Sequence, residues 1–169
     1  MQYLDHDLDE YVVSFKDQAE RDRKIKSLAI DMLNSIEEFH NLTEFAHRDI
    51  KPLNFRVHKN KLYLTDFGLS AEYMKDGQHI AQGKDCPLMG SMRYASHWTH
   101  EGISLSRRDD IEMLGYSILK LLHDNPKDEL WSQIMQKDIL HLSQTEMDVQ
   151  FYKEKMNFVK NQVTNPRFL

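Results

Sequence analysis

The chain has 169 residues, of which 40% are hydrophobic and 29% are charged, and its formal net charge at pH 7 is −5. This composition is close to the average for globular domains and speaks against a disordered or fibrous chain. The negative balance disfavours nucleic acid or an anionic membrane as the main partner, because both select a basic face. Cys86 is the single cysteine, so no internal disulfide forms. We therefore expect an intracellular, by default cytoplasmic, protein without membrane insertion.

The first half of the chain reads as one helix followed by a loop and a hairpin. Residues 20–40 carry apolar side chains at helical spacing, which predicts an amphipathic helix. Residues 47–54 are too polar for a strand and contain a proline, so we expect a loop there. Residues 55–57 and 62–64 are short β-prone runs separated by four polar residues, which predicts a β-hairpin. The fold class expected is mainly α with this small hairpin.

The second half begins with a long irregular stretch. Residues 66–99 show little periodicity and are rich in glycine, which is typical of a functional loop. Residues 110–122 return to helical spacing and are apolar enough for a buried central helix, with one apolar stripe made of Ile111, Leu114, Ile118, Leu119 and Leu122. Residues 127–163 suggest two more helices. No linker interrupts the chain, so we expect one domain over residues 1–169.

The strongest motif lies in the polar loop. The sequence HRDIKPLN occupies residues 47–54, and DFG follows at residues 66–68. Taken singly, Asp49 or Asn54 would be a turn residue or a helix cap more often than a catalyst. As a set of about ten positions in fixed order, however, they resemble the catalytic-loop and metal-binding motifs of protein kinases.

The resemblance implies a role for each polar residue of this set. Phosphoryl transfer needs a carboxylate that accepts the proton of the substrate hydroxyl, and oxygen ligands that hold Mg²⁺ against the ATP phosphates. Asp49 would be the catalytic base, and Lys51 would contact the γ-phosphate. Asn54 and Asp66 would be the metal ligands. ATP and Mg²⁺ are the expected cofactors if the protein is active, and no cofactor is expected if this chain alone is inactive.

Further motifs resemble one group of kinases. GSMRYAS at residues 90–96, THEG at residues 99–102 and SRRDDIEMLGY at residues 106–116 are similar to segments of the casein kinase 1 group. Most other kinases carry A-P-E where this chain has SHW. The resemblance implies serine/threonine specificity, and it implies that Asp110 is a buried anchor for the catalytic loop. Lys84, Arg107 and Arg108 could recognise an acidic substrate or could be solvated or salt-bridged, and both readings stay open.

The resemblance also implies the C-terminal lobe of the protein-kinase-like fold and divides the chain accordingly. Residues 47–68 would hold the catalytic loop and the DFG motif, residues 69–102 the activation segment, and residues 127–169 a divergent helical tail. Residues 1–12 would form a hinge-like segment, because the first eight align without a gap on the hinge between the two kinase lobes. We therefore expect the N-terminal lobe to be absent.

The hinge-like segment carries two further expectations. The resemblance places Leu4 and Asp7 beside the nucleotide. Tyr3, Leu4 and Val12 are expected to form an apolar hinge face that a protein partner covers. Arg56 stands where kinases usually have a leucine-like residue beneath the adenine, and burying a guanidinium there is costly.

Three functions stay open at this level. The leading hypothesis is a catalytically incompetent half-kinase, a pseudokinase that serves as a scaffold subunit of a larger assembly, because the Gly-rich loop and the strand lysine that position ATP are missing. The alternative is part of an active serine/threonine kinase acting on protein substrates, with its N-terminal lobe supplied separately or missing from this sequence, because the catalytic set is intact. A third reading is a regulator that competes with a related kinase for substrates.

Overall fold

The computed structural model describes residues 6–122 and residue 153. By internal contacts the chain divides into two compact units, residues 1–122 and 123–169, and the architecture below is that of the first unit. The helices expected over residues 127–163 lie outside the described residues, apart from Lys153, which is helical. The single domain expected over residues 1–169 stays a prediction.

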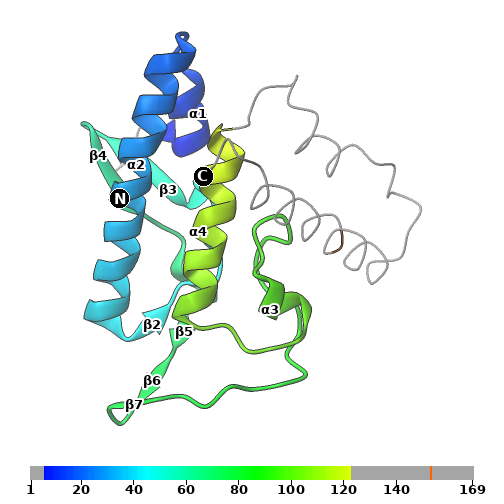
Figure 1. Ribbon diagram of the computed structural model, residues 1–169. Coiled ribbons are helices and arrows are strands. Elements are labelled where there is room, and N and C mark those ends of the chain that lie inside the picture. Colours follow the sequence, from blue (N-terminus) through cyan, green and yellow to red (C-terminus); the bar gives the residue numbers. More distant parts are fainter. Residues whose placement is uncertain (1–5, 123–152, 154–169) are drawn as a thin grey trace. The chain divides into compact units, whose positions relative to one another are not determined.

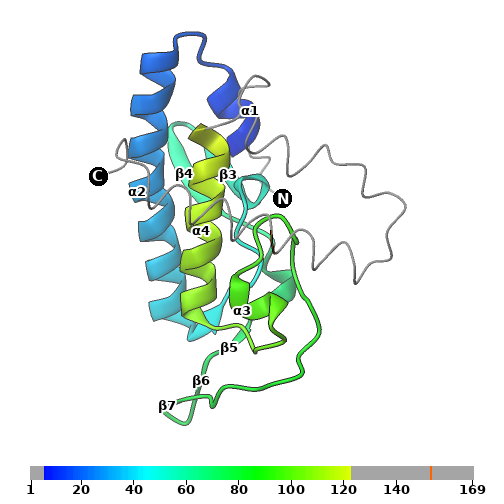
Figure 2. The same cartoon turned by 45° about the vertical axis from the view of Figure 1, so that its right-hand side comes forward.

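Two helices form the framework of the unit. Helix α2 (Gln18–Thr43) lies beside helix α4 (Arg107–Leu122), as Figures 1 and 2 show. The Asp17 carboxylate caps α2 by accepting a hydrogen bond from the Glu20 amide at 2.8 Å. Glu44 ends the helix in a left-handed conformation (φ 59°) and donates its amide to the His40 carbonyl. The helix predicted over residues 20–40 is therefore confirmed and slightly longer.

Helix α4 begins three residues earlier than predicted, because Asp109 reaches back to its start. The Asp109 carboxylate accepts a hydrogen bond from the Ser106 amide at 2.7 Å, which is half of a capping box. Met113, Leu114 and Leu121 are buried, but Ile111 is 45% exposed, so its predicted place in the core stripe is wrong. The buried face of the first turn belongs instead to Asp109 and Asp110.

Three small antiparallel sheets complete the unit. Strands β1 (His6–Asp7), β3 (Phe55–His58) and β4 (Lys61–Leu64) form the first in the order β1-β3-β4. Lys59 and Asn60 both have positive φ, which suits a two-residue turn between twisted strands, and the predicted hairpin is confirmed. The others pair β2 (Phe45–Ala46) with β5 (Ala71–Glu72), and β6 (Met74–Lys75) with β7 (Gln78–His79).

The long segment between β4 and α4 is mostly irregular, as predicted. It contains the short strands β5 to β7, the 3-10 turn η2 (Phe67–Leu69) and the single helical turn α3 (His97–His100). A second 3-10 turn, η1 (Pro52–Asn54), ends the loop of residues 47–54. From the resemblance, this loop keeps the name catalytic loop, and residues 69–102 keep the name activation segment. In both views α3 lies on the side of α4 away from α2, and the β6–β7 hairpin lies at one end of the unit (Figures 1 and 2). Among the described helices, none is long and apolar enough to cross a bilayer.

The hinge-like segment corrects one expectation. Helix α1 (Leu8–Val13) begins after Asp7, whose carboxylate accepts the Glu10 amide at 2.9 Å. Leu8 and Val12 are one helical turn apart and both are buried in the core, so Val12 is not part of an exposed hinge face. Tyr3 and Leu4 lie outside the described residues. Val12 therefore gives no support for a protein partner on this face.

The core joins α2, α4 and the first sheet through one set of buried apolar side chains. These are Leu8, Val12, Ile25, Leu28, Met32, Ile36, Ile50, Phe55, Val57, Met113, Leu114 and Leu121. Replacing the fully buried Ile36 by alanine is expected to lower the free energy of unfolding by about 2–5 kcal/mol, since it leaves a cavity. The matched change at Ile30, which is 61% exposed on the same helix, is expected to cost under about 1 kcal/mol. Urea unfolding of both variants measures the difference, and equal losses would contradict this core.

Candidate active site

The loop of residues 47–54 is anchored by one buried carboxylate. Asp110 is fully buried at the start of α4, and its two oxygens accept the amides of His47 at 2.7 Å and Arg48 at 2.8 Å. The His40 ring on α2 lies 2.7 Å from the same carboxylate through Nε2. The expectation that Asp110 fixes the backbone of this loop is confirmed. It also lets Arg48 keep a left-handed backbone (φ 68°), which few non-glycine residues adopt unaided.

His47 ties the loop to the end of β4. Its ring is buried, with Nδ1 accepting the Asp49 amide at 3.3 Å and Nε2 lying 3.0 Å from the Thr65 carbonyl. This pairing requires the neutral tautomer with its proton on Nε2. The ring also meets the edge of Phe67, which stacks on Phe39 of α2 with ring centroids 5.0 Å apart. The middle residue of the DFG motif is thus docked on α2, next to the catalytic loop.

Asp49 is the centre of a hydrogen-bonded network. One oxygen accepts the Ser91 amide at 2.8 Å, and the other accepts the Lys51 ammonium at 2.6 Å. Lys51 also donates to the Ser91 hydroxyl at 2.8 Å. The Asn54 side-chain amide donates to the Asp49 carbonyl at 2.9 Å. Three of the four predicted site residues therefore lie together, and Ser91, which the sequence analysis did not select, completes the group.

The charge state of Asp49 follows from these contacts. Burial alone would raise the pKa of the Asp49 carboxyl, but the hydrogen bonds from Lys51 and Ser91 and the Lys51 charge outweigh it, so the pKa lies below the ordinary value of 3.8. The carboxylate is therefore ionised at neutral pH and free to accept a proton.

A pH dependence follows with a definite sign. Because the folded-state pKa of Asp49 is lowered, the group stabilises the fold above pH 3.8, and this contribution is lost as the pH falls through the folded-state value. In Asp49→Asn that acid-dependent loss is expected to be smaller than in the wild type. Urea unfolding between pH 3 and pH 7 measures it, and parallel pH profiles for the two proteins would contradict the assignment.

Asn54 and Asp66 are brought together by the hairpin between them. The carbonyl of Asn54 accepts both the amide and the hydroxyl of Thr65, at 2.9 and 3.0 Å, so Asp66 follows directly from a residue bonded to Asn54. Asp66 is exposed, has a left-handed backbone (φ 64°), and receives no hydrogen bond from any described side chain or amide. The side-chain nitrogen Nδ2 of Asn54 faces Asp49, and its side-chain oxygen Oδ1 forms no hydrogen bond within the described residues.

This donor set fits Mg²⁺. One carboxylate and one amide oxygen are the hard ligands that Mg²⁺ takes from proteins, with phosphate oxygens and water filling its other positions. Within residues 6–122 no cluster of three or more His, Cys, Asp or Glu side chains offers a cage made of protein alone. The two predicted ligands therefore suit a metal held jointly with a phosphorylated ligand. Two more nucleotide contacts were predicted in the hinge-like segment. Leu4 lies outside the described residues, and Asp7 caps α1.

Gly90 allows the activation segment to approach the catalytic loop. It has a φ of 78°, and a Cβ placed on it would lie 2.6 Å from the Arg48 carbonyl oxygen and 3.2 Å from the Asp49 carboxylate. The first contact, to a backbone atom, is shorter than real Cβ contacts, and the second is tight, so alanine at this position forces the segment away from the loop. The sequence places Gly90 in a motif but gives no hint that it touches Asp49.

Gly90→Ala is expected to break the hydrogen bond from the Ser91 amide to Asp49 and to lower the free energy of unfolding by about 1–3 kcal/mol. Gly115→Ala is the matched control, since nothing lies within 4 Å of its Cβ position on α4, and it is expected to be neutral or stabilising. Urea unfolding together with hydrogen exchange at the Ser91 amide tests the pair. A Gly90→Ala variant as stable as Gly115→Ala would contradict the close approach.

The end of the activation segment is fastened to α4 by two polar pairs. The Ser96 hydroxyl donates to the Asp109 carboxylate, and both side chains are fully buried. The Glu112 carboxylate accepts the His97 amide and pairs with the His97 ring, each at 2.8 Å. Ser96 and Asp109 belong to two separate sequence motifs, and the structure brings those motifs into contact.

Arg56 lies on β3, half-buried, directly after the loop. It pairs across the sheet with Tyr63 and with Asp7, and no described side chain forms an ion pair with its guanidinium. The position expected beneath the adenine therefore carries a half-buried positive charge that no described acidic side chain neutralises.

Comparison with known families agrees with this geometry. The family model of the protein kinase domain matches residues 1–165, which is nearly the whole chain. The match includes the loop anchored by Asp110, the DFG turn and the activation segment that contacts Asp49. The chain belongs to the protein kinase domain family.

Proposed function

We propose that residues 6–122 form the C-terminal lobe of a casein kinase 1-like serine/threonine protein kinase and carry the lower half of its phosphoryl-transfer site. The observation that supports this most is the state of Asp49, an ionised carboxylate held by Lys51 and Ser91 and bonded to the Asn54 amide, with Asp66 directly after Thr65, which bonds to Asn54. A carboxylate base and two oxygen ligands for a metal are the groups that phosphoryl transfer needs.

The chain's own residues divide the chemistry between them. Asp49 accepts the proton of a substrate hydroxyl as that oxygen bonds to the γ-phosphorus of ATP and the bond to ADP breaks. Lys51, whose ammonium lies 2.6 Å from Asp49, would contact the transferred phosphate. Asn54 and Asp66 would hold Mg²⁺, which offsets negative charge on the phosphates when it is bound.

The assignment to the casein kinase 1 group is supported by the contact between its motifs. Ser96 and Asp109 lie in GSMRYAS and SRRDDIEMLGY and bond to each other in the core. His97 belongs to SHW, which stands where most other kinases carry A-P-E, and it pairs with Glu112 of α4. The group-specific residues therefore act as one unit that holds the substrate-facing segment on α4.

A transfer assay tests the proposal. The protein is purified from its natural source with whatever accompanies it, and transfer from γ-labelled ATP to an acidic serine peptide is measured with and without Mg²⁺. We expect Mg²⁺-dependent labelling of serine and none of a tyrosine analogue of the peptide. Absence of transfer in this native preparation would overturn the catalytic proposal.

A second candidate function is non-catalytic, a scaffold subunit that a protein partner recognises, and Arg56 favours it. A half-buried cation beneath the adenine position disfavours nucleotide binding. The discriminating measurement is the thermal shift produced by Mg·ATP in the wild type and in Arg56→Leu. A shift in the variant alone supports the scaffold, and an equal saturable shift in both rejects Arg56 as the cause.

A further inference from the structure

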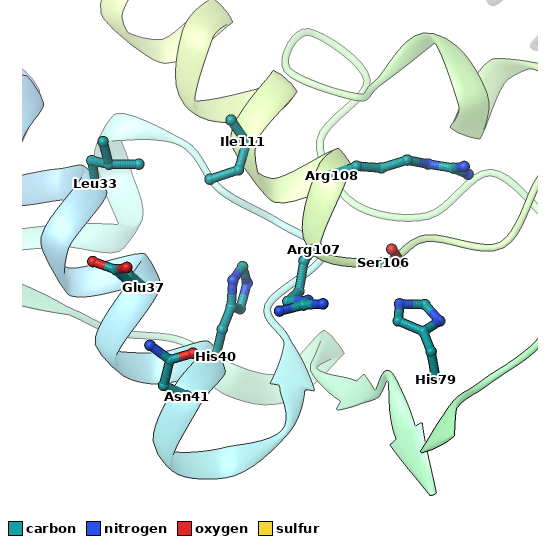
Figure 3. Close-up of a pocket in the computed structure, with 9 residues that line it drawn as sticks. All are labelled: Leu33, Glu37, His40, Asn41, His79, Ser106, Arg107, Arg108 and Ile111. Carbon is teal, nitrogen blue, oxygen red and sulfur yellow. The ribbon is translucent and has the colours of Figure 1, made fainter. Parts of the chain in front are cut away.

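A cavity of about 520 Å³ lies between α2, the start of α4 and strand β7, and none of its described lining residues belongs to the catalytic loop (Figure 3). The C-terminal half of α2 supplies Leu33 and His40, the start of α4 supplies Arg107 and Ile111, and strand β7 supplies His79. The volume falls in the range of about 300–1,000 Å³ that is usual for small-molecule sites. Neither the proposed phosphoryl transfer nor the proposed scaffold role uses this cavity.

Arg107 is a cation with unused donors on one wall. Its guanidinium lies over the Tyr73 ring at 4.4 Å, and it forms no hydrogen bond or ion pair with the part of the chain that is described. Stacking orients the guanidinium but satisfies none of its five N–H groups. Its neighbour Arg108 differs, because Arg108 lies over Trp98 and within 3.3 Å of the Asp109 carboxylate.

His79 extends this polar wall. Its Nδ1 lies 2.9 Å from the Ile80 carbonyl oxygen, which leaves Nε2 for another partner, and its ring is 5.7 Å from the ring of Tyr73. Arg107 and His79 therefore flank the same tyrosine. Figure 3 shows both on one side of the cavity.

The opposite side of the cavity is apolar. Leu33 is 44% exposed and Ile111 is 45% exposed, although both are large hydrophobic side chains. They come from α2 and α4 and lie together in Figure 3. Among the described residues of the lining, Glu37 is the one acidic side chain, and the cations Arg107 and Arg108 outnumber it. The cavity thus joins an apolar surface to a cationic one.

We propose that this cavity binds a small organic anion with an apolar arm, its carboxylate or phosphate against Arg107 and its arm against Leu33 and Ile111. A guanidinium offers two parallel N–H groups to either headgroup, which gives both energy and orientation. The arm removes apolar surface from water.

The His40 side chain connects the cavity with Asp110, the residue that anchors the catalytic loop. His40 lines the cavity, and its ring bonds to Asp110, which holds the amides of His47 and Arg48. The His40 carbonyl also accepts a hydrogen bond from the Tyr73 hydroxyl at 2.9 Å, and the Arg107 guanidinium lies over the Tyr73 ring. A ligand that restricts the motion of Arg107 and His40 therefore also stabilises the conformation of the catalytic loop. In this way the cavity acts as a regulatory site.

Methyl and amide NMR of the full chain tests the site with named probes. We expect 3-phenylpropanoate or phenyl phosphate to shift the methyl signals of Leu33 and Ile111 saturably, and the tighter of the two identifies the headgroup. Arg107→Gln is expected to weaken binding at least tenfold, and Arg107→Lys less. Arg23→Gln, which removes an exposed charge from α2 outside the cavity, is expected to stay within twofold of the wild type. Bound ligand should slow exchange of the His47 and Arg48 amides at least threefold.

Three results would overturn the inference. One is the absence of saturable shifts at Leu33 and Ile111 with either probe. Another is an Arg107→Gln affinity equal to that of the wild type. The third is binding of inorganic phosphate as tight as that of phenyl phosphate, which would remove any role for the apolar wall. Unchanged exchange at His47 and Arg48 with ligand bound would reject the regulatory link. None of these readouts needs phosphoryl transfer, so they stand apart from the assay of catalysis.

Discussion

Asp110→Ala is expected to lower the free energy of unfolding by about 3–5 kcal/mol. The carboxylate is fully buried and has three partners, the His40 ring and the amides of His47 and Arg48. Alanine removes all three interactions and leaves two backbone donors buried without an acceptor. Because these two amides lie at the start of the catalytic loop, we expect the loop to be destabilised before the rest of the unit.

Urea unfolding and hydrogen exchange measure this effect together. Asp110→Asn serves as a milder variant that keeps the size of the side chain. Relative to the wild type, we expect exchange to accelerate more at the His47 and Arg48 amides than at the amides of α2. Glu38→Ala is the control, an exposed acid on α2, and it is expected to change stability by under about 0.5 kcal/mol. An Asp110→Ala midpoint equal to that of the wild type would show that another group anchors the loop.

Asp49→Asn is expected to lower the rate of phosphoryl transfer by about 10²–10⁴-fold, since it removes the group that accepts the substrate proton. The folded structure should persist, because the amide keeps the size of the carboxylate and can still accept the Ser91 amide. Asp66→Asn is expected to act differently. It removes a ligand charge, so the Mg²⁺ concentration for half-maximal transfer should rise along with the loss of rate.

The two variants are compared in the native preparation used for the transfer assay. Asp76→Asn is the matched control, because Asp76 is an exposed aspartate in the β6–β7 turn with a φ of 53°, which asparagine tolerates well. We expect it to transfer phosphate at the wild-type rate. Should Asp49→Asn keep more than a tenth of the wild-type rate, Asp49 is not the base and another carboxylate must be sought.

Much of the local structure could be predicted because it depends on neighbours in the chain. The apolar spacing that forms α2, the two β-prone runs of the hairpin and the polar loop between them are properties of single segments. Val12 and Ile111 were misplaced for a related reason. Val12 was placed on an exposed face by the resemblance of residues 1–12 to a hinge, and Ile111 was placed in a buried helix by periodicity alone. In both cases the side that is buried depends on what packs against the segment.

The site itself divides in the same way. Asp49, Lys51, Asn54 and Asp66 are recognisable in the sequence by their order and spacing, and the family match supports the kinase domain that this motif indicates. Ser91 and Gly90 were not selected, since nothing near them in the chain marks a contact with Asp49. That contact spans 42 residues and forms when the activation segment folds back.

The sequence by itself determined the family, the helix and hairpin elements and the residues that would carry the chemistry. Motifs and periodicities can be recognised in the sequence because they involve residues that are close together in the chain. The tertiary structure alone decided what holds the catalytic loop, how Asp49 stays ionised and where an unpaired arginine meets an apolar wall. Each of these depends on groups roughly 30 to 70 residues apart, whose approach is set by the packing of α4 on α2.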